Sequence, residues 1–134
     1  MLCNEDSIYY ATATDVIGIT SNGTSSSTIL TAQNALLEYD TSSGRLIYFD
    51  ELDQTLSSVK LDGSDKVVIS TGESIKQFSI DYISRTIYYI DRAGNNDIKS
   101  LNINNRTDIS VVLEAITGSL GGNVNDLDVD PEMG

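Results

Sequence analysis

The sequence of 134 residues contains no histidine, no tryptophan, one cysteine and one proline. Histidine is the commonest general base and metal ligand, and it is the base of Ser-His and Cys-His nucleophile pairs. Its absence excludes those arrangements. A phosphate-binding glycine loop is absent too, because Leu120-Gly121-Gly122 is followed by no lysine and opens no predicted helix. We therefore predict a non-enzymatic protein with no catalytic residues, no metal site and no cofactor.

Basic residues are also scarce. Eight lysines and arginines face twenty aspartates and glutamates, which gives a formal net charge of −12 at pH 7. Such a charge repels nucleic acid and anionic membranes, and it accelerates the encounter with a basic partner. We predict no nucleic-acid partner, and basic proteins as ligands. Solubility alone is an equally good explanation of the charge.

Long apolar runs are missing, so no segment is a transmembrane helix and none is expected to insert into a membrane. The first six residues contain no basic residue and no apolar run, unlike a signal peptide. Cys3 is the sole cysteine and has no partner within the chain for a disulfide bond. If the protein is secreted, a lone cysteine so close to one end indicates a disulfide to a preceding module.

What the sequence does contain is a repeat of about forty residues. Ile8-Tyr9-Tyr10, Ile47-Tyr48-Phe49 and Ile87-Tyr88-Tyr89 begin 39 and 40 positions apart. Leu-Asp-Gly and Leu-Asn-Ile segments follow the second and third copies at similar distances. A constant period of this length, made of short strand-like runs, is typical of β-propellers, whose units cannot bury their apolar faces alone.

Each full unit is predicted to have four short strands separated by turns rich in Asp, Asn, Gly and Ser. Helix is expected to be nearly absent, because no segment has a convincing period of 3.6 residues. The units are 1–35, a degenerate one without its opening strand; 36–75; 76–122; and 123–134, the first strand of a further unit. The predicted strands are 7–11, 15–20, 28–30, 36–39, 45–49, 55–61, 66–70, 77–80, 86–90, 97–103 and 109–113.

Propeller rings have four to eight blades, so about three units are too few for a ring. We expect the chain to be a fragment, or a half-ring that needs a partner. Three blades leave two radial faces lined by apolar and aromatic residues. The isolated chain is therefore predicted to be unstable or to form a two-fold dimer, with three blades from each copy.

Tyr88-Tyr89-Ile90-Asp91 resembles the Tyr-Trp-Thr-Asp motif of the low-density lipoprotein receptor class B repeat. The run from Leu37 to Asp91 is similar to that family's pattern along its length. This resemblance implies an all-β fold, a partial six-bladed β-propeller with about three four-stranded blades. Two departures stand out: Tyr48-Phe49-Asp50-Glu51 has Asp and Glu in place of Thr and Asp, and Tyr10, Phe49 and Tyr89 replace the tryptophan.

The motif residues are expected to have structural roles. The resemblance implies that the aromatic side chain packs between blades and that Asp91 hydrogen-bonds backbone across the blade junction. A catalytic or metal-binding aspartate is the competing hypothesis. The residues assigned to the repeat motif are Tyr9, Tyr10, Asp40, Tyr48, Phe49, Asp50, Asp81, Tyr88, Tyr89, Asp91 and Asp130.

Two further patterns have functional interpretations. Asp126, Asp128 and Asp130 invite a calcium site, but Pro131 stands where a calcium loop needs glycine, so a structural strand is favoured. Asn22 and Asn105 begin Asn-X-Thr triplets in predicted loops, which makes them candidate glycosylation acceptors. Chance occurrence is the alternative for both triplets.

The resemblance implies an extracellular, ligand-binding or scaffold propeller in the ectodomain of a single-pass low-density lipoprotein receptor-related protein, with an endocytic or signalling role. It also implies flanking cysteine-rich growth-factor-like modules, which would explain Cys3. A matrix or basement-membrane adhesion protein with the same propeller is one alternative. A propeller hydrolase is another, and it would need carboxylates or metal ligands that converge on the central channel.

Overall fold

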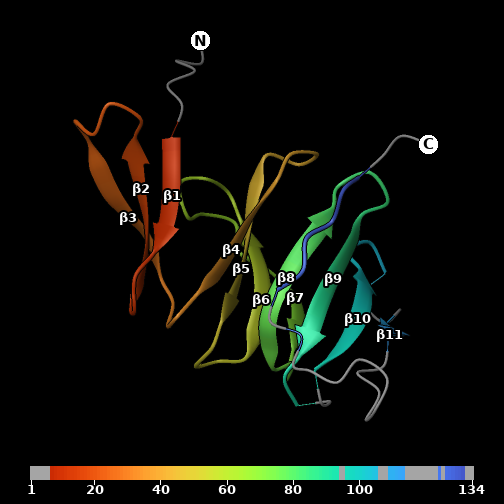
Figure 1. Cartoon of the computed structure of the whole chain (residues 1–134). Helices are drawn as coiled ribbons and strands as arrows, with labels where there is room; N and C mark the ends of the chain where they lie inside the picture. Colours follow the sequence, from red (N-terminus) through yellow and green to blue (C-terminus); the bar gives the residue numbers. More distant parts are fainter. Residues whose placement is uncertain (1–6, 94–95, 106–108, 114–123, 125, 132–134) are drawn as a thin grey trace.

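The computed structural model describes residues 7–93, 96–105, 109–113, 124 and 126–131, and Figure 1 shows three sheets side by side. Every paired strand is antiparallel to its neighbour, and no described residue is helical. The first sheet contains β1 (Ser7–Ala11), β2 (Asp15–Thr20) and β3 (Ser26–Thr31). The second contains β4 (Leu36–Asp40), β5 (Arg45–Asp50), β6 (Thr55–Val59) and β7 (Val67–Thr71), and the third contains β8 (Ile75–Asp81), β9 (Thr86–Asp91), β10 (Asp97–Asn102) and β11 (Ile109–Leu113).

The predicted all-β class is confirmed, and each of the eleven predicted strands is present within two residues of its expected bounds. Each sheet is a meander in which successive strands pair. The first sheet has only three strands among the described residues, as expected for a unit without its opening strand. β-branched and aromatic residues fill the strands, because they fit a pleated surface that is covered on its faces.

A β-bulge recurs at the same place in all three sheets, at the start of the strand that follows the tyrosine motif. It lies between Val16 and Ile17 in the first sheet and between Leu56 and Ser57 in the second. In the third it follows Ile98. Bulges bend a strand and increase its twist, so a bulge at one fixed place gives the three sheets the same shape.

These bulges align the repeats and correct the sequence alignment of the second unit. Tyr10, Tyr48 and Tyr89 each lie opposite the first residue after the bulge. Tyr48, and not Phe49, therefore corresponds to Tyr89, and Asp50 corresponds to Asp91. The prediction that Phe49 replaces the motif tryptophan is wrong by one residue, and a slip of one residue exchanges the two faces of a strand.

Two apolar clusters join the sheets. One lies between the first and second sheets and includes Val16, Leu46 and Tyr48. The other lies between the second and third and includes Phe49 and Tyr89. Since successive side chains of a strand point to opposite faces, Tyr48 contacts the sheet before it and Phe49 the sheet after it.

The residues after β11 that the structure describes lie alongside β8 (Figure 1). The Lys76 ammonium donates a hydrogen bond to the Val124 carbonyl oxygen at 2.8 Å, and the Ser79 hydroxyl donates one to Asp128 Oδ1 at 3.1 Å. Residues 126–131 are not in a strand ladder. That residues 123–134 open a further unit stays a prediction, as do the other unit boundaries.

The β6–β7 loop packs closely against the first sheet, at Gly63. This residue has a φ of +83°, and a Cβ atom built on it would lie 2.1 Å from the backbone oxygen of Ile29. Gly63→Ala combines strain of a left-handed backbone with a steric clash, so it should lower the free energy of unfolding by more than about 2 kcal/mol. Urea denaturation would measure this loss.

Gly72 provides a matched control. Its φ is +78°, but a Cβ atom there would meet nothing within 4 Å. Gly72→Ala should therefore cost only the backbone strain, about 1 kcal/mol. Equal losses for the two variants would contradict the close approach of the β6–β7 loop to β3.

Candidate functional site

A buried ion pair joins the second and third sheets at one end of β4. Arg85 Nη1 lies 2.6 Å from Asp40 Oδ1, and the Asp40 side chain is only 2% exposed. Ser42 and Ser43 of the following turn also donate hydrogen bonds to this carboxylate. Burial alone raises the pKa of Asp40, but these hydrogen bonds and the Arg85 charge together outweigh it and lower the pKa. Asp40 thus stabilises the turn that follows β4 and links the second sheet to the third through Arg85.

Asp81 has the same place in the third sheet as Asp40 has in the second. It accepts hydrogen bonds from the amides of Ile83 and Ser84 and from the Ser84 hydroxyl. The hydrogen bonds from Ser84 lower the pKa of Asp81. The turn is therefore repeated, whereas the counterpart of Arg85 would have to come from a further sheet.

Two aspartates lie at the opposite end of the motif strands. Asp50 accepts a hydrogen bond from the Gln33 amide, in the connection from the first sheet, at 3.2 Å. Asp91 accepts one from the Ala93 amide and forms an ion pair of 2.5 Å with Lys99 of its own sheet. The hydrogen bond with Asp91 raises the pKa of Lys99. The backbone hydrogen bond across a junction that the resemblance implied for Asp91 is thus seen at Asp50.

The tyrosines of the motif have different surroundings in the three sheets. Tyr48 and Tyr89 are buried between sheets, whereas Tyr10 is exposed. Burial, together with the charge and hydrogen bond of Glu73, raises the pKa of the Tyr89 hydroxyl. Tyr9 and Tyr88 are half-buried on the opposite faces of their strands. The predicted packing of the motif aromatic between blades is therefore realised by Tyr48 and Tyr89.

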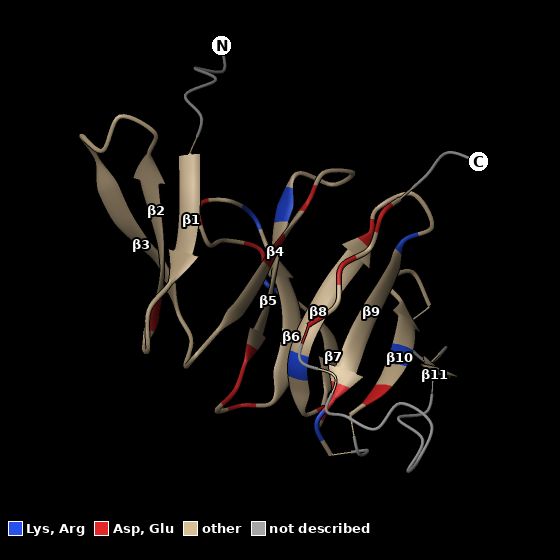
Figure 2. Cartoon of the chain, viewed as in Figure 1, with Lys and Arg blue, Asp and Glu red and all other residues tan. Residues whose placement is uncertain are grey.

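Carboxylates gather beside the inner strands β4 and β8, where Figure 2 shows acidic residues along the C-terminal segment. Asp128 accepts a hydrogen bond from Ser79 on β8, and Asp126 accepts one from Gln77 at 3.2 Å. Burial and the negative charge of Asp128 raise the pKa of Glu38 on β4 above its ordinary value of 4.5. These carboxylates form an acidic strip, defined here as Glu38, Asp126 and Asp128.

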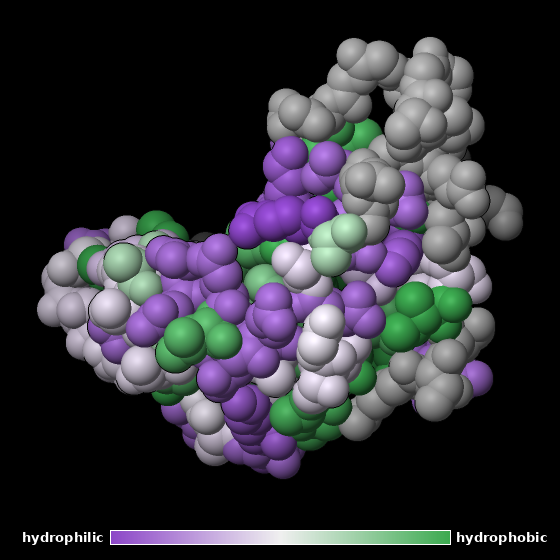
Figure 3. All heavy atoms as spheres, turned by 90° about the horizontal axis from the view of Figure 1, so that it is seen from below, coloured by the Kyte–Doolittle hydropathy of each residue, from purple (hydrophilic) through white to green (hydrophobic). Residues whose placement is uncertain are grey.

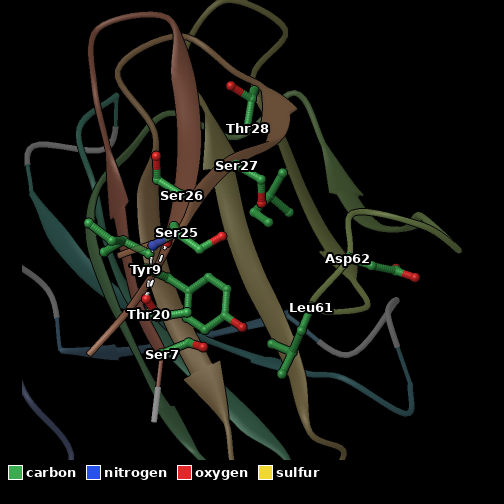
Figure 4. Close-up of a pocket in the computed structure, with 12 residues that line it drawn as sticks. Ser7, Tyr9, Thr20, Ser25, Ser26, Ser27, Thr28, Leu61 and Asp62 are labelled. Atoms are coloured by element: carbon green, nitrogen blue, oxygen red, sulfur yellow. Dashed lines mark hydrogen bonds between the residues drawn. The ribbon is translucent and has the colours of Figure 1, made fainter. Parts of the chain in front are cut away.

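An open hollow of about 560 Å³ lies at the other junction, between the first sheet and the β6–β7 loop (Figure 4). Tyr9, Ile29 and Leu61 are among its apolar lining residues, and serines and threonines form most of the remainder. A side chain at Gly18 would meet Tyr9 and Ile29 at 3.1 Å, so glycine keeps the floor open. Asp62 adds a single carboxylate to the lining, so the hollow offers hydroxyl, apolar and one acidic contact.

The candidate modification sites are placed in part. Asn22 lies at the exposed β2–β3 turn, where Asn22 Oδ1 accepts hydrogen bonds from the Thr24 amide and hydroxyl. Asn105 is exposed after β10, while the two following residues of its triplet lie outside the described residues. Cys3 also lies outside them. Whether either triplet is glycosylated stays a prediction.

Asp130 is exposed, at the end of the acidic segment that follows β8 in space. Within the described ranges, no group of three or more metal-ligating side chains is arranged to hold a metal ion. No helix that could cross a membrane is found among those residues either.

Comparison with known proteins identifies the architecture. No family model matches the chain, and no curated protein matches it by sequence. A solved structure that it resembles is a chain in the crystal structure of a nidogen/laminin complex, with a TM-score of 0.69 and 16% sequence identity. The fold is a β-propeller. Its three sheets are blades, and the likeness covers 80% of this chain but only 44% of the matched chain.

Sequence reasoning did not find several residues of the blade junctions. Arg85 and Gln33 contact motif aspartates across junctions and Lys99 contacts one within its own blade, yet none of the three recurs in the repeat. Gly44 stands in the second blade where Arg85 stands in the third, and both have a positive φ. The two turns therefore share a left-handed backbone conformation at this position, but they do not share a charged residue, so the repeat pattern did not reveal Arg85.

The Asp40–Arg85 pair should contribute strongly to stability. Arg85→Ala leaves the Asp40 carboxylate buried without its charged partner, so we expect a loss of about 3 kcal/mol in the free energy of unfolding. Arg92→Ala removes an ion pair with Glu51 in which both side chains are about half exposed, and should cost less than about 1 kcal/mol. Urea titrations that give equal losses would contradict a junction role. Adding Asp40→Asn to Arg85→Ala should restore part of the loss.

The acidic strip predicts a pH-dependent penalty. A carboxyl group whose pKa is higher in the folded than in the unfolded chain destabilises the fold as pH rises through the raised pKa. Glu38→Gln should therefore increase the free energy of unfolding at pH 7, and this gain should disappear below the ordinary pKa of 4.5. Glu51→Gln, in an exposed turn, should give no such gain. Denaturation at several pH values would measure both, and a gain for Glu38→Gln that persists in acid would contradict the assignment.

Proposed function

We propose that this chain is part of an extracellular β-propeller that binds other proteins and has no enzymatic activity. The observation that supports this most directly is the propeller fold itself, in which aromatic and aspartate residues of the repeat have packing roles. The motif resemblance supports membership of the low-density lipoprotein receptor class B repeat family. We place the propeller in the ectodomain of a single-pass receptor-related protein, with endocytosis or signalling as its role.

A matrix or basement-membrane adhesion module is the second candidate. It is favoured by one specific observation, the structural likeness to a chain from a nidogen/laminin complex. Both candidates have protein partners outside the cell. In either context Cys3 would pair with a cysteine-rich growth-factor-like module, and Asn22 and Asn105 would carry glycans.

The partner is proposed to be basic, and the acidic strip is its proposed contact. A net charge of −12 attracts cations from every direction, and the strip places carboxylates from two separate parts of the chain together. Burial is the larger cause of the raised pKa of Glu38 and the negative charge of Asp128 is the smaller one, and a bound cationic side chain would offset both. Electrostatic complementarity of this kind gives specificity and fast association.

Binding of a lysine- and arginine-rich peptide would test this function. Asp126→Asn/Asp128→Asn should weaken the affinity by about tenfold, whereas Glu51→Gln/Asp53→Asn, with the same change in charge on an exposed turn, should have a much smaller effect. Isothermal titration calorimetry at low and physiological salt would measure both. Equal losses in the two variants would show that only net charge matters and would reject the strip as the contact.

A further inference from the structure

The first blade exposes a face that is buried in the other two. Tyr10 is 44% exposed, whereas its counterparts Tyr48 and Tyr89 are 3% and 0% exposed. Ile8 is 54% exposed, and Leu46 at the same place in the second blade is 2% exposed. In the second and third blades, these positions contact the blade that precedes them. The face of Ile8 and Tyr10 therefore has the composition of a blade contact.

The third blade exposes part of the opposite face, at its outer strand, whereas Ile90 on that face is buried. Val112 on β11 is 54% exposed, whereas Ile69, its counterpart on β7, is 5% exposed and packs against the third blade. Tyr88 is half-buried where its counterpart Ile47 is fully buried. Figure 3 shows hydrophobic atoms gathered at this end of the molecule. This face is the one on which a following blade would pack.

The two ends of the described structure also complement each other in their strands. The first blade has three described strands, with β1 at its inner edge, and residues 126–131 form an extended segment without a sheet. Leu127 and Val129 of this segment are half-buried, whereas Asp126, Asp128 and Asp130, which alternate with them, are exposed. This alternation is that of an inner strand. The segment also lies beside β8 in space, with Asp128 at the level of Ser79.

We propose that two copies of this chain associate head to tail into a closed ring of six blades. The segment 126–131 of each copy pairs with β1 of the other copy and completes its three-stranded blade. Ile8 and Tyr10 then cover the exposed face of the third blade, at Tyr88 and Val112. Six blades lie within the range of four to eight for propellers, and the two-fold symmetry leaves no radial face uncovered.

The blades themselves give the register of the new strand pair. Asp40 pairs with Arg45, and Asp81 pairs with Thr86, at the start of each inner hairpin. Ser79 of β8 lies beside Asp128 of the segment. Two residues further along both, Asp81 therefore corresponds to Asp130. The counterpart of Thr86 on β1 is Ser7. Asp130 of one copy therefore lies opposite Ser7 of the other.

Sedimentation of the chain at micromolar concentrations tests the ring. We expect a dimer that Tyr10→Asp and Val112→Asp each convert to monomer, because each places a charge in an apolar contact. Leu52→Asp, at a turn residue that is 66% exposed and outside the proposed contact, should leave the dimer intact. Circular dichroism would establish that the variants keep their β structure. A wild-type chain that sediments as a cooperatively folded monomer would overturn the proposal.

Disulfide crosslinking tests the register without relying on destabilising variants. With Cys3→Ser as background, copies that carry Ser7→Cys are mixed with copies that carry Asp130→Cys and are oxidised. Directly opposed residues on antiparallel strands meet the geometry of a disulfide, so a crosslinked pair should form rapidly. Copies with Asp128→Cys, two residues away, should crosslink to Ser7→Cys much more slowly. Equal rates, or a dimer without the Ser7–Asp130 crosslink, would overturn the proposed strand pairing.

Discussion

The apolar contact between adjacent blades is the interaction on which the rest of this structure depends. A four-stranded sheet of this size cannot exclude water from both of its faces by itself, so each blade is stable only against a neighbour. Tyr48 and Tyr89 occupy the same place in successive blades and are both buried, whereas Tyr10 has the same place and remains exposed. The tyrosine at this repeat position is therefore buried only where a preceding blade of the described structure covers it.

Polar contacts orient the blades that the apolar contact brings together. Asp40 binds its own turn and Arg85 of the next blade, while at the other end of the motif strand Asp50 binds the Gln33 amide of the connecting segment. The carboxylates are buried, so the hydrogen bonds are needed to offset loss of hydration. Each of the two junctions thus has its own polar contact, Asp40–Arg85 between the second and third blades and Asp50–Gln33 between the first and second. These hydrogen bonds are directional, whereas the apolar contact beside them is not.

This division of roles leaves recognition to the edges and ends of the blades. The wide faces of each blade are used for packing, and the motif residues on them are structural. The channel-side strands and the turns remain available, and there the acidic strip brings together Glu38 from β4 and Asp128 from the distant C-terminal segment. This charge distribution is the basis on which a basic protein partner is proposed, and the sequence can change on the turns without loss of the fold.

The repeat period, the strand alternation and the turn residues determined the architecture from the sequence alone, because these signals are local and recur three times. They located the strands and placed Tyr10 and Tyr89 at the same motif position, but they put Phe49 there in place of Tyr48. Only the tertiary structure decided that Tyr48 and Asp50 match Tyr89 and Asp91, since a period of forty or forty-one residues looks the same in sequence but exchanges the faces of a strand. It also decided the partners Arg85 and Gln33 and the meeting of Glu38 with Asp128. Those contacts join residues far apart in the chain, and the angle at which blades stack, which no local pattern encodes, brings them within reach.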